Sequence, residues 1–149
     1  MIRNVHTRQV PNPAELVDRV PDLWPSPRWP PLVLDRPLGP GATGGHAFVR
    51  YRCTAHVPGR RVEFTFDPAI GLVGTHTFEV VPGGLRHTLV GRARGWTRLT
   101  WPLAIRWLHD ALIEDLMDNA ARAAGHPPAH PNRWSPWVRL LRAAAKRRV

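Results

Sequence analysis

The sequence predicts an α+β protein: a curved antiparallel sheet wrapped around one long C-terminal helix, with a short helical region after the first strand. Residues 46–94 alternate between apolar and polar side chains through four strand-like segments separated by turns. Residues 101–124 instead repeat apolar side chains at helical spacing. Because no other long element is available to bury the apolar face of such a sheet, that face must pack against the helix.

Length and composition favour a single globular domain. The 149 residues fit one compact domain, and a 43% apolar share is enough for one core. The 12 glycines and 17 prolines argue against a helical bundle. Cys53 is the only cysteine, so no internal disulfide can form, and no Cys/His spacing resembles a zinc site. We therefore expect neither a metal nor a cofactor.

The positive charge is concentrated in the C-terminal segment. The formal net charge is +10, and Lys146 is the only lysine among 21 basic residues. Residues 126–149 hold six basic residues and no acidic one, which leaves residues 1–125 with a modest +4. No reader motif for nucleic acids is present, so no nucleic-acid partner is expected. The sequence has neither an apolar signal-peptide core nor a membrane-spanning run, which predicts a cytoplasmic protein.

The first 45 residues predict short elements separated by proline and glycine. Ile2–Val10 alternates β-branched and polar residues and predicts one strand. Asn12 is expected to cap a short amphipathic helix over Ala14–Val20, with Pro13 in its first turn and Pro21 at its end. The rest of this region predicts an irregular corner over residues 22–31, a brief strand over Leu32–Asp35 and a turn over Gly39–Gly45.

The clearest alternation predicts a hairpin of two strands, His46–Val57 and Arg61–Phe66. Gly59-Arg60 fits a two-residue type II′ turn. That turn would pair Val57 with Val62, Ala55 with Phe64 and Cys53 with Phe66. The inward side chains would then be Ala47, Val49, Tyr51, Cys53, Ala55 and Val57 on the first strand and Val62, Phe64 and Phe66 on the second. Phe48 is the one residue that breaks the pattern.

A second hairpin is predicted from Gly74–Val81 and Leu85–Arg94, which flank a turn at Pro82-Gly83-Gly84. Its register brings two histidines, His76 and His87, to the inward face. The apolar residues of the same face are Phe78, Val80, Leu85, Leu89 and Ala93.

Residues 101–124 predict a long amphipathic helix that ends at Gly125. Its apolar stripe consists of Trp101, Ile105, Leu108, His109, Leu112 and Leu116. An acidic row, Asp110, Glu114 and Asp118, recurs every four residues on the opposite face, where we expect contact with solvent and pairing of Asp110 with Arg106. Trp107 lies outside the apolar stripe, so it should be exposed or covered by another segment.

Several segments resemble those of a known superfamily. They are Val10-Pro11 before the first helix, Leu23-Trp24-Pro25, residues 38–42 (LGPGA), residues 75–80 (THTFEV) and Trp101-Pro102-Leu103. In this order of elements, residues 1–124 resemble the START-like or SRPBCC superfamily, whose fold is called helix-grip, and within it the polyketide cyclase/dehydrase branch. The resemblance implies a deep hydrophobic cavity between sheet and helix. The superfamily uses this cavity for lipids, polyketides, hormones and quinones, so the fold fixes no single function.

Such a cavity would be lined by inward side chains of the predicted strands and helix. We expect the lining to include Tyr51, Phe64, His76, Phe78, His87, Trp101, Ile105, His109 and Leu112. The leading hypothesis is binding of one hydrophobic or amphipathic small molecule, such as a lipid, a quinone or a polyketide-like compound, without catalysis. Alternatively, the same residues pack as a filled core, with the histidines bonded to backbone carbonyls or to tyrosine.

A cyclase, aromatase or dehydratase is the second hypothesis. His76 and His87 are its candidate catalytic residues, together with His109, because histidine titrates near neutral pH and can move protons at a bound carbonyl. No inward carboxylate is expected beside them, and no nucleophile-elbow motif occurs. Their positions on separate elements lack the spacing of a zinc-binding helix, so no metal is expected there.

The C-terminal segment suggests a third hypothesis, a peripheral membrane or interaction module. We expect a helix-grip domain over residues 1–125, followed by a proline-rich linker and a basic amphipathic tail over residues 126–149. A helix over Trp134–Val149 would suit an anionic membrane surface. The residues facing that surface would be Trp134, Trp137, Arg139, Arg142, Lys146, Arg147 and Arg148. Otherwise the tail docks on its own domain, over Trp107, or stays disordered.

Overall fold

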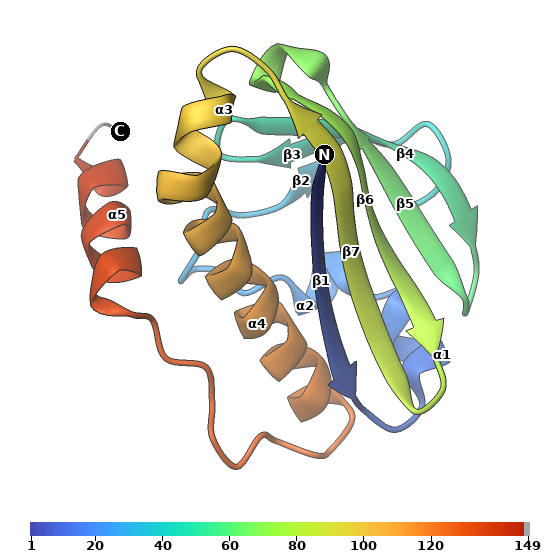
Figure 1. The fold of residues 1–149 in the computed structure, drawn as a ribbon. Helices are drawn as coiled ribbons and strands as arrows, with labels where there is room; N and C mark the ends of the chain where they lie inside the picture. Colours follow the sequence, from blue (N-terminus) through green and yellow to red (C-terminus); the bar gives the residue numbers. More distant parts are fainter. Residues whose placement is uncertain (148–149) are drawn as a thin grey trace.

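The computed structural model describes residues 1–147 and has a seven-stranded antiparallel sheet that curves around one long helix (Figure 1). The strands follow the order β1-β7-β6-β5-β4-β3-β2 across the sheet. They are β1 (Ile2–Gln9), β2 (Val33–Leu34), β3 (Thr43–His46), β4 (Val49–Val57), β5 (Arg61–Phe66), β6 (Leu72–Val81) and β7 (Gly84–Ala93). The predicted α+β fold is confirmed.

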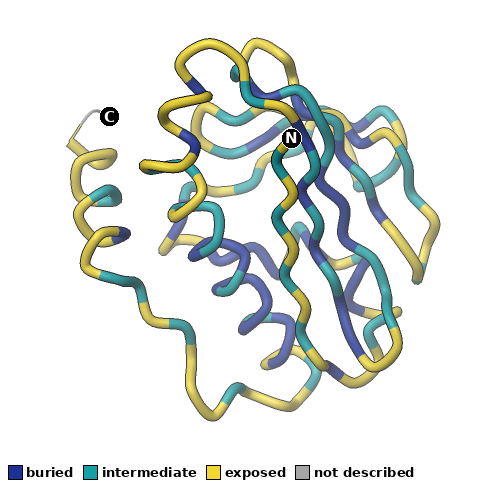
Figure 2. Tube along the Cα trace, in the orientation of Figure 1, coloured by how far each residue is buried: buried dark blue, intermediate teal, exposed yellow. Residues whose placement is uncertain are grey.

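The helices comprise short pieces after β1, one long helix and a C-terminal helix. They are α1 (Pro13–Val17), α2 (Val20–Leu23), the 3₁₀ turn η1 (Pro68–Ile70), α3 (Thr97–Thr100), the π-helical segment η2 (Trp101–Ile105), α4 (Arg106–Ala123) and α5 (Pro136–Lys146). The segments α3, η2 and α4 follow one another without a break and form a helix of 27 residues. It begins one turn before the predicted start and ends at Ala123, close to the predicted end, with Gly125 just beyond it in the left-handed conformation. Its sheet-facing side is buried (Figure 2).

The helix predicted over Ala14–Val20 is two short helices. Asn12 has a left-handed conformation with φ of 50° and makes no side-chain cap, so the predicted capping is wrong. Pro21 was expected to end the helix but lies in the first turn of α2, where a missing backbone N–H costs nothing. Asp18 lies at the break, where its carboxylate accepts a 2.7 Å hydrogen bond from the Gly59 N–H. The break therefore ties this region to the loop between β4 and β5.

The strand predicted from His46 begins at Val49 instead. His46 ends β3, and Ala47-Phe48 form the turn to β4, with Ala47 at φ of 49°. Ala47 is therefore a turn residue, not an inward strand residue, and the exposure of Phe48 at the turn explains the break in alternation. The glycine-rich stretch predicted as a turn contributes β3. Glycine is required there, because a Cβ on Gly45 would lie 1.9 Å from the Val49 carbonyl oxygen.

The predicted register between β4 and β5 is wrong. The observed pairs include Tyr51 with Phe66, Cys53 with Phe64 and, beyond an irregularity between Cys53 and Ala55, Val57 with Arg61. The connection has three residues, Pro58-Gly59-Arg60, and a bulge then shifts the pairing by one residue. Val57 consequently lies exposed at the end of the hairpin. The aromatic residues of both strands still face inward.

The second hairpin agrees with the prediction. Val81 pairs with Gly84 across a two-residue loop, Pro82-Gly83. His76 on β6 and His87 on β7 are both buried, as the alternation predicted.

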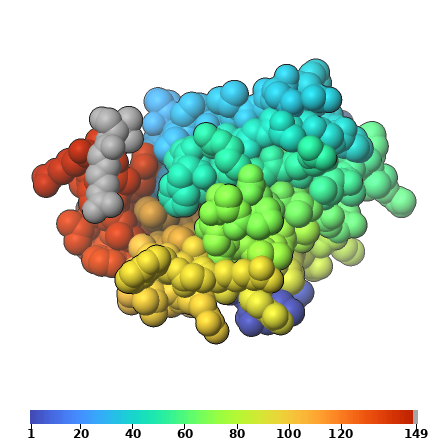
Figure 3. All heavy atoms as spheres, turned by 90° about the horizontal axis from the view of Figure 1, so that it is seen from above, coloured from blue at the N-terminus to red at the C-terminus, as the bar shows by residue number. Residues whose placement is uncertain are grey.

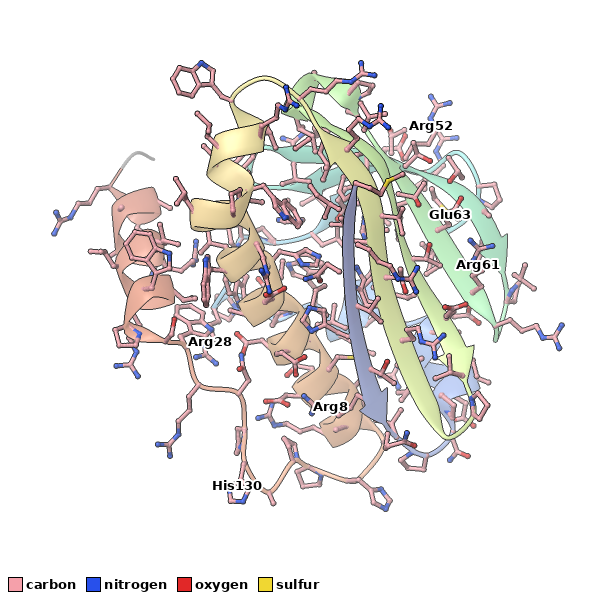
Figure 4. The ribbon with its side chains drawn as sticks, viewed as in Figure 1. Arg8, Arg28, Arg52, Arg61, Glu63 and His130 are labelled. Carbon is pink, nitrogen blue, oxygen red and sulfur yellow. The ribbon has the colours of Figure 1, made fainter. Side chains whose placement is uncertain are left out.

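The acidic row of α4 faces strand β1 and not solvent, contrary to our expectation. Arg8 of β1 donates hydrogen bonds to Asp118 Oδ1 at 2.6 Å and to Glu114 Oε2 at 2.8 Å. In Figure 4, Arg8 lies beside α4. Asp110 Oδ1 accepts a 2.8 Å hydrogen bond from Asn4 Nδ2. The predicted pairing of Asp110 with Arg106 is present as a longer contact of 3.7 Å.

The reason for this orientation is the row of polar residues on the helix-facing side of β1. Asn4, His6 and Arg8 alternate with more exposed residues, and that alternation turns them all toward α4. A cationic and amide row therefore meets a carboxylate row at the strand-helix contact. This pairing fixes the position of the long helix across the sheet.

The tail helix α5 is shorter than predicted. Ser135 caps it by accepting a hydrogen bond from the Val138 N–H, and Val138 is its one fully buried residue among those described. Arg148, which we expected in the same helix, lies outside the described residues. Trp107 stays half exposed, and its indole N–H donates to the Pro102 carbonyl oxygen of its own helix at 3.0 Å.

Candidate functional site

A cavity of about 1100 Å³ lies between the sheet and the long helix. Its walls come from β4, β5, β6 and β7 on one side and from η2 and α4 on the other. Several of the lining residues are exposed and mark its open end, among them Pro27, Phe48 and Lys146. The mouth therefore lies between the segment after α2, the β3–β4 turn and the C-terminal end of α5.

Most of the predicted lining residues surround this cavity. They are Tyr51, His76, Phe78, Trp101, Ile105, His109 and Leu112. Phe64 and His87 do not line it and are fully buried in the core. Their place in the sequence pattern is the same as that of their lining neighbours. Alternation predicts which face of the sheet a side chain lies on. It does not predict whether a side chain on that face lines the cavity or packs in the core.

His76 is a buried polar residue in the apolar wall of the cavity. Its ring stacks on Phe64 and Phe66 at centroid distances of 5.1 and 4.9 Å and meets the Tyr51 ring edge-on at 4.8 Å. Its Nε2 atom is buried and has no hydrogen-bond partner among the described residues. Burial lowers the pKa of His76 to about 3, so the ring is neutral at pH 7. It thus presents an unpaired donor or acceptor toward the cavity.

Sequence analysis missed His46, which also lines the cavity. Its ring lies 4.7 Å from the ring of Trp24, and burial lowers its pKa to about 4. In one continuous strand over His46–Val57, the alternation would put His46 on the outward face, opposite to Ala47 and Val49. The signal that would have placed it correctly is Gly44-Gly45, which allows the close backbone pairing that makes β3 a separate strand.

These two histidines predict a loss of stability in mild acid. Above pH 6.5 both are neutral whether the protein is folded or unfolded. Below pH 6.5 the unfolded chain binds protons that His46 and His76 cannot take up in the fold, so stability falls by up to about 1.4 kcal/mol per pH unit for each histidine. Urea midpoints measured between pH 7.5 and 5 should decrease, and His76→Phe should reduce that slope. Equal slopes in both proteins would contradict the assignment to His76.

A second group of histidines runs from the cavity wall to strand β1. The ring of His109 lies 5.1 Å from that of His87 and 6.0 Å from that of His6. Burial lowers the pKa values of His87 and His109. For His6 burial acts in the same direction, but hydrogen bonds to Asp110 and Glu114 outweigh it and raise the pKa to about 9. His6 is therefore an imidazolium at neutral pH.

The C-terminal segment is attached through Asp115, a residue of α4 that is only 4% exposed. The indole N–H groups of Trp29 and Trp134 donate to Asp115 Oδ2 at 2.7 and 2.9 Å, and Asn132 Nδ2 donates to Oδ1 at 2.7 Å. Arg28 lies 3.3 Å from the same carboxylate and over the Trp134 ring. The tail thus docks on its own domain, at Asp115 and not over Trp107. Trp134 is consequently engaged within the protein.

The docked α5 supplies the charged part of the cavity lining. Figure 3 shows α5 in red against the blue segment that follows α2. The Arg142 guanidinium lies 4.8 Å from the Trp29 ring centre and donates to the Arg28 carbonyl oxygen at 2.9 Å, while its buried Nε has no partner in residues 1–147. Arg142 and Lys146 line the cavity, and no aspartate or glutamate does so among the described residues. Sequence analysis had placed both residues on an outer, membrane-facing side.

Comparison with known proteins supports the fold. No protein-family description and no curated protein sequence matches the chain. A solution structure from Thermobifida fusca is similar with a TM-score of 0.59 and 19% identity, covering 87% of this chain and 97% of that one. CalU16 from Micromonospora echinospora has a TM-score of 0.56 and 13% identity, over 95% and 81%. The crystal structure of Ara h 8.0201 has a TM-score of 0.53 and 14% identity, over 78% and 93%.

The fold is therefore the helix-grip fold of the SRPBCC or Bet v 1-like proteins, as the sequence resemblance implied. Proteins of this fold typically bind a hydrophobic ligand in the cavity under the helix. At identities below 20% in these three comparisons, the likeness extends to the fold alone. Within residues 1–147, no helix combines the length and the hydropathy needed to cross a bilayer.

Proposed function

We propose that this protein binds one amphipathic small molecule whose apolar part fills the cavity and whose anionic group lies at the mouth. The observation that carries the proposal is the cavity itself, about 1100 Å³ of space with largely apolar walls. A filled core would leave no such space, because protein interiors pack to near-crystalline density. Pockets of this size and character are typical of small-molecule sites.

The charges at the mouth favour an anionic group on the ligand. Arg142 and Lys146 line the cavity on the α5 side, and Arg142 Nε is buried without a partner. A carboxylate or phosphate oxygen at this point would accept the missing hydrogen bond and offset both positive charges. An uncharged ligand of the same length would leave the Arg142 donor unpaired.

The buried histidines support binding over acid-base catalysis. A catalytic acid or base works best when its pKa lies near the working pH. The pKa of His76 is about 3 and that of His46 about 4, so both are neutral groups at pH 7. His76 suits a hydrogen bond to a carbonyl or hydroxyl group in the middle of the ligand. The cyclase-type activity considered from the sequence gains no support from these values.

Two probes that differ only in the terminal group test the proposal, namely oleic acid and oleyl alcohol. We expect both to displace a fluorescent apolar probe from the full chain, with oleate binding at least about tenfold more tightly, a difference of about 1.4 kcal/mol. The variant Arg142→Gln/Lys146→Gln should lose this preference but still take up oleyl alcohol. Arg139→Gln, an exposed position on the same helix, is the matched control and should keep the preference.

The outcomes separate the two parts of the proposal. If neither probe binds at saturating concentration, the cavity is not a ligand site. If oleate and oleyl alcohol bind equally to the unmodified protein, the site binds apolar ligands and the proposed preference for an anionic group is wrong. Native mass spectrometry of protein purified from its own host, followed by organic extraction, would identify the natural ligand. A stoichiometric anionic amphiphile is the expected result.

A further inference from the structure

We propose that His6, His109 and Asp110 form a binding site for one divalent first-row transition metal ion, with zinc as the probe. The residues come from β1 and from one turn of α4. Their donor atoms, two imidazole nitrogens and one carboxylate oxygen, all lie within 4.8 Å of one another. Of the three residues, only His109 also lines the cavity.

The spacing of the donor atoms is close to what a tetrahedral ion requires. His6 Nε2 lies 3.2 Å and His109 Nδ1 lies 3.7 Å from Asp110 Oδ1. Zinc bonds of 2.0–2.1 Å place neighbouring ligand atoms about 3.3 Å apart in tetrahedral geometry. Both distances to the carboxylate are thus within about 0.4 Å of this value, and the two imidazole nitrogens lie within 4.8 Å of each other, so binding of one ion would draw the histidines together around it. Two imidazoles and one carboxylate are a donor set that zinc accepts, with a fourth position left for water.

One of the donor atoms has nothing else to bind. His109 Nδ1 is buried and has no hydrogen-bond partner among the described residues, although Asp110 is its neighbour. An unsatisfied buried nitrogen is unfavourable unless something outside the protein pairs with it. The ring of His87 lies 5.1 Å from that of His109, with both of its nitrogens also unpartnered. The interior thus holds several free imidazole nitrogens beside one carboxylate.

The residues around His6 are arranged like the hydrogen-bond partners that orient a metal-binding histidine. Its Nδ1 is 2.7 Å from Glu114 Oε1, and Arg8 in turn holds Glu114 by a 2.8 Å hydrogen bond. A metal-binding histidine commonly donates its second N–H to a carboxylate in this way, which fixes the ring and leaves the other nitrogen for the ion. At present Nε2 contacts Asn4 Oδ1 at 2.9 Å and Asp110 Oδ1. Binding of the ion releases the proton of Nε2 to solvent.

Charge and access also suit a cation. With a neutral His6, the local carboxylates Asp110, Glu114 and Asp118 are opposed by Arg8 and by the more distant Arg106. The cluster then carries a net charge of −1, which a divalent ion reverses to +1. The side chains of His6, His109 and Asp110 are 11%, 15% and 31% exposed, so Asp110 is the member of the site that is most open to solvent.

The test is titration of the chelator-treated full chain with zinc chloride at pH 8, followed by calorimetry and native mass spectrometry. We expect one ion per chain with a dissociation constant below about 10 μM. His109→Phe and Asp110→Asn should each weaken binding at least tenfold. The control His126→Gln/His130→Gln removes two exposed histidines after α4 and should leave binding unchanged. Cobalt(II) offers an independent readout, because its visible spectrum reports tetrahedral nitrogen and oxygen ligands without requiring a folding comparison.

Two results would overturn the proposal. One is no uptake of zinc at 100 μM by a protein whose circular dichroism shows it folded. The other is uptake that survives His109→Phe and Asp110→Asn but is lost in the His126/His130 variant, which would assign the ion to surface histidines. Should Asp110→Asn unfold the protein, Glu114→Gln provides the substitute, with an expected loss of about tenfold through its hydrogen bond to His6. Unchanged affinity in that variant, together with unchanged affinity in His109→Phe, would reject the site.

Discussion

Replacing Asp115 by alanine is expected to destabilise the protein by about 3 kcal/mol or more and to release the C-terminal segment from the domain. The carboxylate accepts hydrogen bonds from Trp29, Asn132 and Trp134, and its removal leaves these largely buried donors without an acceptor. The urea midpoint should fall, and residues after Gly125 should become sensitive to protease well below the concentration at which the sheet unfolds.

The control for this prediction is Asp22→Ala. Asp22 is an exposed carboxylate on α2, and its loss should change stability by no more than about 0.5 kcal/mol. If Asp115→Ala behaved like the control, the tail would be held by apolar packing of Val138 and the tryptophan rings, and the hydrogen bonds at Asp115 would be incidental. Equal protease sensitivity of Asp115→Ala and Asp22→Ala would likewise indicate that apolar packing holds the tail.

The second large effect is expected from Phe64→Ala, which should cost about 3–5 kcal/mol. Phe64 is 1% exposed and stacks on His76, so truncation leaves a void that the sheet cannot close. Phe48→Ala is the matched control, because this phenylalanine lies on the exposed turn at the cavity mouth. Its truncation should be almost neutral for folding. Equilibrium unfolding in urea measures both changes.

This pair of variants also distinguishes packing from ligand contact. Phe48→Ala should weaken oleate binding more than it weakens folding. Phe64→Ala, measured under conditions in which the variant is still folded, should weaken folding more than it weakens oleate binding, since Phe64 does not line the cavity. If Phe64→Ala weakened oleate binding more than Phe48→Ala did, the cavity would extend past His76 into the space assigned to the core.

The sheet faces could be predicted from the sequence because alternation has a period of two that survives small errors. The inward face of the β6–β7 hairpin was predicted correctly, because a loop of two or of four residues puts the same side chains on that face. The β4–β5 register was wrong because neither the three-residue connection nor the irregularity after Cys53 has a distinctive sequence signal. The inward direction of Tyr51 and Phe66 was nevertheless correct.

The acidic row and the tail were misplaced for a different reason. Each was analysed as a single helix, in which charged residues opposite an apolar stripe are normally solvated. What decides the position of Asp118 is Arg8, more than a hundred residues earlier. What decides the position of Trp134 is Asp115, which sequence analysis did not single out. Pairings over such distances depend on the assembled fold, so no local period reveals them.

The location of α5 has a consequence for how the protein acquires a ligand during synthesis. The wall that carries Arg142 and Lys146 is translated after every strand and after the long helix. Domains begin to fold as they leave the ribosome, so the sheet can close around α4 while the mouth is still unfinished. A nascent chain would therefore present an open apolar hollow. Under the proposed function, the anionic ligand would be retained only after α5 has packed against Trp29, so loading would follow the folding of the sheet and of α4.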